Sequence, residues 1–246
     1  MKTMAKMIGL VLGVALLVLA VPLWVYFPGH NFRTVEQGVF YGSRQMGPDA
    51  LEAAIKKHKI KTVVNLRGTN PGKPWYDEEV AVCSRLGVAH EDFAWSKNRI
   101  PDPESLARFL DLMENGRKPF LAHCEGGTHR TGVAAASFLL LRGVGVEAAR
   151  GQFGPFFNDA PIGRLLDLYE GSGMAFRQWV REVYPGRYNS LKASRAVSPE
   201  GERSAAPLGT RALEAVRPLS AQSRTMGAQR HLPCRSAGWR QDCEFA

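Results

Sequence analysis

The chain has 246 residues, enough for one domain with extensions or for two small domains. It carries 32 Lys and Arg residues against 23 Asp and Glu residues, and the formal net charge of +9 raises the question of a nucleic-acid or anionic-lipid partner. Residues 192–246 contain nine of the basic residues and five acidic ones, so a large share of the excess charge lies in a polar tail. We therefore expect no nucleic-acid partner and predict a disordered basic tail over this range.

An apolar segment occupies the N-terminal region. Residues 7–27 contain no charged side chain and are long enough to cross a bilayer core as a helix. Trp24 and Tyr26 suit an aromatic anchor at the membrane interface, and the two lysines before the segment predict a cytoplasmic N-terminus with the remainder outside. The alternative is a cleaved signal peptide, with residues 18–20 as the cleavage site. We assign residues 1–27 to an anchor or signal segment and favour a single-pass anchor in the inner membrane with a periplasmic domain.

Residues 28–191 are predicted to form one folded domain in which strands and helices alternate. The run from Thr62 to Leu66 is rich in β-branched residues without polar alternation, which indicates a strand covered on both faces, as in a parallel sheet between helices. We predict an α/β fold with a central, mostly parallel sheet flanked by helices. The predicted strands are 39–41, 62–66, 88–94 and 120–123, and the predicted helices are 48–57, 76–86, 104–115, 130–141, 147–152, 162–170 and 174–183.

The most informative stretch is residues 120–132, in which an apolar strand runs into a glycine-rich turn and then a helix. A loop with this arrangement can point successive backbone N–H groups inward and form an anion-binding nest, which the helix dipole reinforces. The paired glycines allow the backbone angles that such a turn requires. The N–H groups predicted to bind an anion belong to Glu125, Gly126, Gly127, Thr128, His129 and Arg130.

Two side chains of this loop carry the predicted chemistry. Arg130 follows Cys124 by six positions and would face its sulfur across the loop, where the planar guanidinium can bind two phosphate oxygens. The same surroundings would lower the pKa of the Cys124 thiol and make it a nucleophile. His123 and Thr131 are placed to orient the sulfur or to hydrogen-bond with it.

The chain contains a second Cys and Arg pair at the same spacing. Cys234 and Arg240 follow Pro233 in the polar tail, with no apolar run before them. We interpret this match as chance, because only the first pair has a strand before it and an apolar helix after it.

At the first pair the chain resembles the cysteine-dependent tyrosine and dual-specificity phosphatases. Residues 39–45 look like the YRSxQP opening of small bacterial and fungal members, and residues 62–67 look like their NLR strand, so the resemblance covers about residues 38–185. It implies an α/β fold, a cysteinyl-phosphate intermediate and no metal or other cofactor. The family signature HCxxGxxRT is matched by His123, Cys124, Gly127, Arg130 and Thr131.

The general acid is less clearly marked. The family places an Asp on a loop between the preceding strand and helix, which leaves Asp102 as our first choice and Asp92 as the second. Asp102 would otherwise serve as the N-cap of the following helix. Asn98 occupies the position that aligns with the acid of some bacterial relatives, and it cannot donate a proton in the same way. Arg67 and Arg99 are candidates for a second anionic contact.

The leading interpretation is a monomeric, membrane-anchored phosphatase of the dual-specificity type. Its expected substrate is a phosphorylated protein, by default phosphotyrosine, or a small phosphate monoester; a lipid or sugar phosphate at the membrane is an open alternative. A different class of function is a phosphate-binding module without turnover, which the uncertain acid motivates. A sulfur-transfer or arsenate-reducing enzyme would also use a thiolate in an anion loop, but the His-Cys and Arg-Thr-Gly flanks make this a minor alternative.

Overall fold

The computed structural model describes residues 2–153 and 161–197. The chain divides into a unit from Met1 to Pro199 and a unit from Glu200 to Ala246, and the second lies outside the described residues. Most of the predicted tail therefore lies outside them as well. The elements are α1 (Lys2–Tyr26), β1 (Arg33–Glu36), β2 (Phe40–Arg44), α2 (Pro48–His58), β3 (Thr62–Asn65), α3 (Pro74–Arg85), β4 (Ala89–Asp92), α4 (Pro103–Asn115), β5 (Phe120–Cys124), α5 (His129–Leu141), α6 (Val146–Arg150), two 3-10 turns (Gly151–Phe153 and Pro161–Gly163), α7 (Arg164–Tyr169), α8 (Phe176–Glu182) and α9 (Tyr184–Val197).

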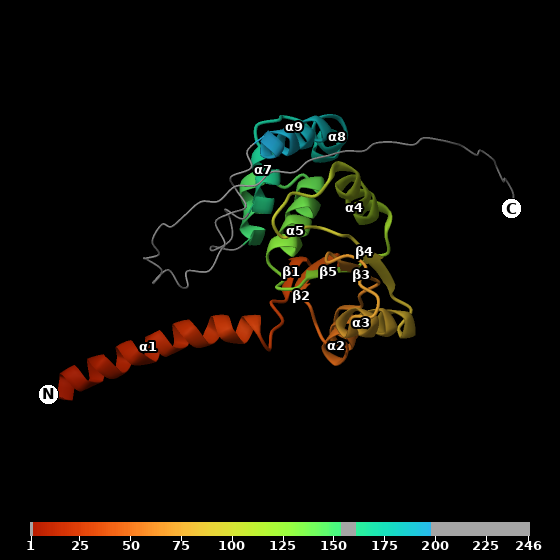
Figure 1. Ribbon diagram of the computed structural model, residues 1–246. Helices are drawn as coiled ribbons and strands as arrows, with labels where there is room; N and C mark the ends of the chain where they lie inside the picture. Colours follow the sequence, from red (N-terminus) through yellow and green to blue (C-terminus); the bar gives the residue numbers. More distant parts are fainter. Residues whose placement is uncertain (1, 154–160, 198–246) are drawn as a thin grey trace, which may run out of the picture. The chain divides into compact units, whose positions relative to one another are not determined.

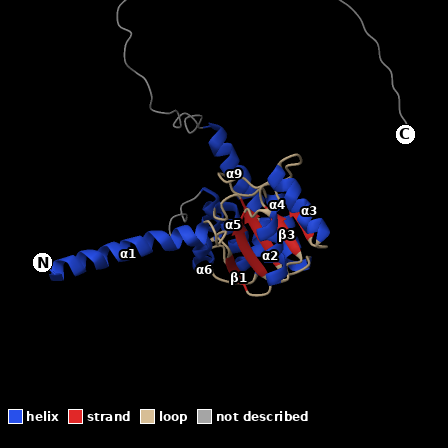
Figure 2. Ribbon diagram, turned by 90° about the horizontal axis from the view of Figure 1, so that it is seen from below, coloured by secondary structure: helices blue, strands red, loops and turns tan. Residues whose placement is uncertain are grey.

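The sheet has five strands in the order β1-β2-β5-β3-β4. The strands β2, β5, β3 and β4 are parallel to one another, and β1 pairs with β2 in the antiparallel direction. Helices lie on both sides of the strands (Figure 2). The predicted α/β class with a mostly parallel central sheet is confirmed.

The pattern of burial explains why the central strands are parallel and covered. Every residue of β3 and β5 is buried, which leaves neither face of these strands for solvent. Helices α2 and α3 cover one face, and α4 and α5 lie on the other (Figure 1). Two apolar clusters result, one on each side of the sheet.

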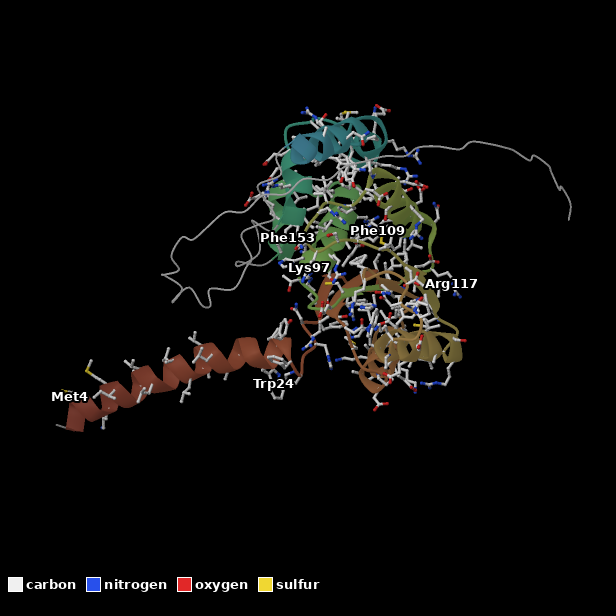
Figure 3. All side chains as sticks on the ribbon, viewed as in Figure 1. Met4, Trp24, Lys97, Phe109, Arg117 and Phe153 are labelled. Atoms are coloured by element: carbon white, nitrogen blue, oxygen red, sulfur yellow. The ribbon has the colours of Figure 1, made fainter. Side chains whose placement is uncertain are left out.

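The larger cluster lies between the sheet and helices α4 and α5. Phe109 of α4, labelled in Figure 3, is fully buried there. Its ring contacts the rings of Phe93 and Trp95. Helix α5 places three consecutive alanines, residues 134–136, in the same cluster. Small side chains allow a close approach of the helix to the sheet, and this approach fixes the start of α5 relative to the end of β5.

Local signals set the helix boundaries. Proline occupies the first position of α2, α3 and α4, where its missing N–H costs no hydrogen bond. Helix α3 consequently begins at Pro74, two residues before the predicted start. Helix α9 was not predicted: it runs from Tyr184 to Val197, so residues 192–197 are helical where we expected the disordered tail to begin.

The described residues include one helix that is long and apolar enough to cross a membrane, from Lys6 to Tyr26. Its described apolar side chains are exposed, including Leu10 at 70% and Trp24 at 71%. A signal sequence has the same length and composition, so these properties establish a candidate span and no orientation.

Candidate active site

The loop after β5 lies against the end of β2. Gly127 has a φ angle of +70°, and a Cβ atom at this position would lie 2.5 Å from the backbone nitrogen of Arg44 and 2.6 Å from the carbonyl carbon of Ser43. Both the angle and the space therefore require glycine. The parallel register places Arg44 directly beside Cys124, so the loop starts at the carboxyl edge of the sheet, where ligands bind in folds of this type.

The Cys124 thiol is enclosed and hydrogen-bonded. Its residue is only 3% exposed. Burial acts to raise the pKa of this thiol, but hydrogen bonds from the hydroxyl and backbone N–H of Thr131, the charge of Arg130 and the backbone N–H of Gly127 outweigh it. The net effect lowers the pKa of Cys124 below its ordinary value, which favours the nucleophilic thiolate.

Arg130 is held at the site by the ends of neighbouring strands. Its Nη1 atom donates to the carbonyl oxygens of Leu66 and Trp95, each at 3.4 Å. It shares with Cys124 a pocket of about 490 Å³. The residues that line this pocket are Tyr26, Arg44, Lys97, Cys124, Glu125, Gly126, Thr128, His129 and Arg130.

The pocket contains more positive charge than the loop sequence indicates. Arg44 from β2 and Lys97 from the loop after β4 line it together with Arg130, against the single carboxylate of Glu125. Lys97 is labelled in Figure 3. The pKa of His129 is lowered by its burial and by the charges of Arg130 and Lys97, which favours its neutral form. Arg44 and Lys97 lie far from the loop in the chain, so the loop sequence gives no sign of their role.

A buried carboxylate holds His123 from behind the loop. Glu79 of α3 is 3% exposed, and its Oε1 atom lies 3.0 Å from Nε2 of His123 and 2.8 Å from Nε2 of His90. Its Oε2 atom accepts a hydrogen bond of 2.6 Å from Gln45. Burial alone would raise the pKa of Glu79, but the two histidines lower it to about 2. The ionised carboxylate thus fixes the orientation of the residue immediately before Cys124.

Arg33 of β1 brings a second buried charge close to the thiol. Its Nε and Nη2 atoms are buried and have no hydrogen-bond partner in the described part of the chain. Burial lowers the pKa of Arg33, and the negative charge of the Cys124 thiolate opposes this effect. Gly42 provides the space, since a Cβ atom there would lie 3.0 Å from Cγ2 of Thr131 and 3.2 Å from Nε of Arg33. An arginine on an edge strand carries no recognisable motif, and the sequence did not indicate it.

The two predicted acids lie elsewhere. Asp102 is exposed and caps α4, where its Oδ1 atom accepts a hydrogen bond of 2.8 Å from the backbone N–H of Ser105. Asp92 accepts hydrogen bonds of 2.7 Å from Asn65 and 2.6 Å from the Tyr76 hydroxyl. Among the described residues that line the pocket, neither carboxyl group is present.

The other residues that the sequence suggested for anion contact or proton donation are Arg67, Arg99 and Asn98. Arg67 donates to Gln45 at 3.1 Å and its guanidinium lies 3.6 Å from the centre of the Trp75 ring, so it extends the Glu79 network. The described pocket lining contains neither Asn98 nor Arg99. The backbone N–H of Asn98 donates to the Ser96 hydroxyl within the loop after β4.

Removal of the Thr131 hydroxyl should weaken the thiolate. A hydrogen bond to a charged group contributes about 1.5–3 kcal/mol, so Thr131→Val should raise the pKa of the Cys124 thiol and move the midpoint of its pH-dependent labelling to higher pH. The measurement is the rate of iodoacetamide labelling of the peptide that contains Cys124, followed by mass spectrometry across pH. Thr34→Val, at an exposed position of β1, is the control and should leave this rate unchanged. An equal rate in the two variants would contradict the assigned hydrogen bond.

The Glu79 carboxylate should make stability depend on pH. Its pKa is about 2 in the folded chain, against about 4.3 when unfolded, so its contribution is complete above pH 4.3 and is lost as the pH falls toward 2. A shift of this size corresponds to about 3 kcal/mol. Glu79→Gln should therefore lower the free energy of unfolding at pH 7 by about this amount and flatten its decline below pH 5. Urea denaturation of the full chain in detergent measures both, and Glu78→Gln, exposed in the same helix, is the matched control.

Comparison with known proteins places this site in a family. Over 99 residues the chain is 27% identical to the human dual specificity protein phosphatase CDC14C. The aligned region covers 40% of this chain and 21% of that protein. The chain is 25% identical over 111 residues to the tyrosine-protein phosphatase cdc-14 of Caenorhabditis elegans, covering 45% of this chain and 14% of that protein. The aligned regions thus span only 21% and 14% of the length of these relatives.

Two solved structures are similar over most of their own length. The core catalytic domain of the PP-IP phosphatase SIW14 from S. cerevisiae has a TM-score of 0.44 and 18% identity, covering 69% of this chain and 94% of that one. TpbA of P. aeruginosa has a TM-score of 0.44 and 19% identity, and the similarity covers 68% of this chain and 92% of the TpbA chain. The family model described as "Tyrosine phosphatase family" matches residues 26–151, just over half of the chain and the whole of the loop from Cys124 to Arg130. The chain therefore belongs to the tyrosine phosphatase family.

Proposed function

We propose that this chain hydrolyses phosphate monoesters by transferring the phosphoryl group first to the sulfur of Cys124 and then to water. The observation that carries the proposal is the pairing of a thiol of lowered pKa with Arg130 in one pocket. A thiolate in contact with a guanidinium and backbone N–H groups suits attack on a phosphorus whose oxygens those groups hold.

In the first step the thiolate of Cys124 attacks phosphorus and forms the S–P bond, while the bond from phosphorus to the ester oxygen breaks. Charge spreads over the three remaining oxygens, and Arg130 with the backbone N–H groups of residues 125–130 stabilises it. The leaving oxygen takes a proton from the general acid, proposed to be Asp102, and departs as an alcohol or phenol. Arg44 and Lys97 add positive charge around the entering dianion.

In the second step water attacks the phosphorus of the cysteinyl phosphate. Its proton passes to the conjugate base of the acid used in the first step, and the S–P bond breaks to release inorganic phosphate. Thr131 stabilises the departing thiolate through the same hydrogen bond that lowers the pKa of Cys124. His123, held by Glu79, keeps the end of β5 in place during both steps.

The finer parts of the proposal concern substrate and location. Protein phosphotyrosine, with phosphoserine or phosphothreonine, is the substrate class implied by the family, and a lipid or sugar phosphate is the alternative. We propose that residues 1–27 are retained as a single-pass anchor, that residues 28–191 form the catalytic domain on the periplasmic side of the inner membrane, and that residues 192–246 are a basic tail. The chain is proposed to act as a monomer.

A phosphate-binding protein without turnover is the second candidate. It is favoured by one observation, namely that neither Asp92 nor Asp102 is among the described residues lining the pocket. The lowered pKa of Cys124 favours the enzyme, because binding alone requires no thiolate.

Replacement of the nucleophile separates the two candidates. The full chain in detergent should release inorganic phosphate from an aryl phosphate, and Cys124→Ser should reduce kcat to the background rate because a serine hydroxyl is not ionised in this site. Acid-quenched wild-type enzyme should contain phosphate on the Cys124 peptide, as detected by mass spectrometry. The control is Cys83→Ser, since burial and the charge of Glu79 raise the pKa of that thiol to about 12 and make it inert. A wild-type chain that binds phosphate but releases none would establish the second candidate.

Asp102 remains the proposed general acid, because it lies on the loop after β4 that also carries Lys97. Asn caps helices as well as Asp does, so Asp102→Asn should fold normally and any change in kcat reports proton donation. If Asp102 is the acid, this replacement should lower kcat by about 10²-fold or more for an alkyl phosphate, because its leaving oxygen needs the proton. The decrease should be much smaller for a nitrophenyl phosphate. An unchanged kcat for both substrates would restrict Asp102 to its capping role.

A further inference from the structure

The last residue of α1 is part of the pocket wall. Tyr26 ends the helix and lines the pocket, and its hydroxyl lies 3.2 Å from the position that a Cβ atom on Gly126 would take. The guanidinium of Arg44 lies 4.9 Å from the centre of the Tyr26 ring and 5.5 Å from that of Phe27. Arginine over aromatic faces is a stabilising contact. The helix end and the phosphate-binding loop are therefore direct neighbours.

The connection from α1 to the sheet is short and hydrogen-bonded. The carbonyl oxygen of His30 accepts from the backbone N–H of Arg44 at 2.9 Å, and the Nδ2 atom of Asn31 donates to the carbonyl oxygen of Gly126 at 3.0 Å. Within the helix end, the N–H of Asn31 donates to the carbonyl oxygen of Val25 at 3.0 Å. The segment 27–32 thus holds the helix end beside the loop, in contrast to a long flexible linker.

The length of the apolar segment sets the depth of Tyr26 in a membrane. A helix over residues 6–26 rises about 31 Å at about 1.5 Å per residue, close to the roughly 30 Å thickness of a bilayer hydrocarbon core. Its last turn then lies at the boundary where lipid headgroups begin. Trp24 and Tyr26, both exposed, are the residue types enriched at this level.

From these contacts we infer that the physiological substrate is a phosphate monoester carried by a membrane lipid. The acyl chains remain in the bilayer while the terminal phosphate enters the pocket beside Tyr26. This inference rests on the proposed phosphatase function and on the proposed retention of α1. It assigns to Tyr26 contact with the lipid headgroup.

The charge of the pocket fits such a headgroup. A terminal phosphate carries up to two negative charges, and Arg44, Lys97 and Arg130 face it with only Glu125 opposing. A lipid monoester reaches a pocket at headgroup depth by lateral diffusion. A phosphorylated protein must instead bring its modified side chain down to the bilayer surface, past Tyr26 of the anchor at the edge of the pocket. The position of Tyr26 therefore favours the lipid over the phosphopeptide as substrate.

The substrate test uses the full chain reconstituted in phosphatidylcholine vesicles. The probes are dioleoylglycerol phosphate in the same vesicles, its soluble dihexanoyl analogue, a phosphotyrosine peptide and nitrophenyl phosphate. We expect kcat/KM for the vesicle-bound lipid to exceed that for the peptide by at least tenfold. An equal or higher value for the peptide overturns the inference, as does an equal value for the dihexanoyl analogue, which would show that the membrane plays no part in presenting the phosphate.

An insertion tests the geometry. Ten Gly and Ser residues placed between Phe27 and Pro28 separate the anchor from the pocket but keep the hydrogen bonds of His30 with Arg44 and of Asn31 with Gly126. The ratio of lipid turnover to nitrophenyl phosphate turnover should fall at least tenfold, and an unchanged ratio overturns the inference. Insertion of the same ten residues after Val197, at the end of helix α9, is the matched control and should keep the ratio. Absence of nitrophenyl phosphate hydrolysis by the uninserted chain would instead refute the proposed phosphatase function itself.

Discussion

The close approach of the loop at Gly127 to the end of β2 is the constraint on which the site depends. A side chain at this position would overlap with the backbone of Ser43 and Arg44. Because the loop can lie this close, the backbone N–H of Gly127 points at the sulfur of Cys124 and the N-terminus of α5 begins immediately behind it. The strand order contributes to the site as much as the loop does. Because β5 lies between β2 and β3, polar groups at the ends of both neighbouring strands lie beside the loop.

The charged groups around the Cys124 thiol lie on two sides of it, some facing the open pocket and one buried. Arg130, Arg44 and Lys97 face the open pocket, where an incoming anion can neutralise them. Arg33 lies on the buried side of the thiol. Two of its nitrogen atoms have no hydrogen-bond partner among the described residues, and the thiolate of Cys124 interacts favourably with its charge. Burial of a charge without a partner is costly, so ionisation of Cys124 and the placement of Arg33 stabilise one another. The Glu79 carboxylate lies next to His123, one residue away, where it orients the strand end.

Features encoded by adjacent residues could be predicted from the sequence. The loop with Cys124 and Arg130 lies within a few positions of the chain, and the apolar run of β3 was enough to indicate a covered parallel strand. The partners brought in by tertiary structure could not be predicted in the same way. In the sequence Glu79 is one of several acids in a predicted helix, and its role depends on the packing of α3 against β4, which brings the carboxylate to His90 and His123. Tyr26 was interpreted as a membrane anchor alone, because nothing in the local sequence places it beside Gly126. The acid was ambiguous for a physical reason: an Asp before a proline at a helix start fits a cap and a proton donor equally well.

Strand β1 has a consequence for work with soluble fragments. It follows the anchor directly, carries Arg33 beneath the thiol, and is preceded by Asn31, whose side chain holds the loop at Gly126. Removal of the apolar helix by truncation at or beyond residue 33 would therefore delete a loop support and loosen a charge from the reactive centre while leaving the family signature untouched. Fragments designed from the signature alone would be catalytically impaired for a reason invisible in their sequence, and a fragment that keeps both groups has to begin before Asn31.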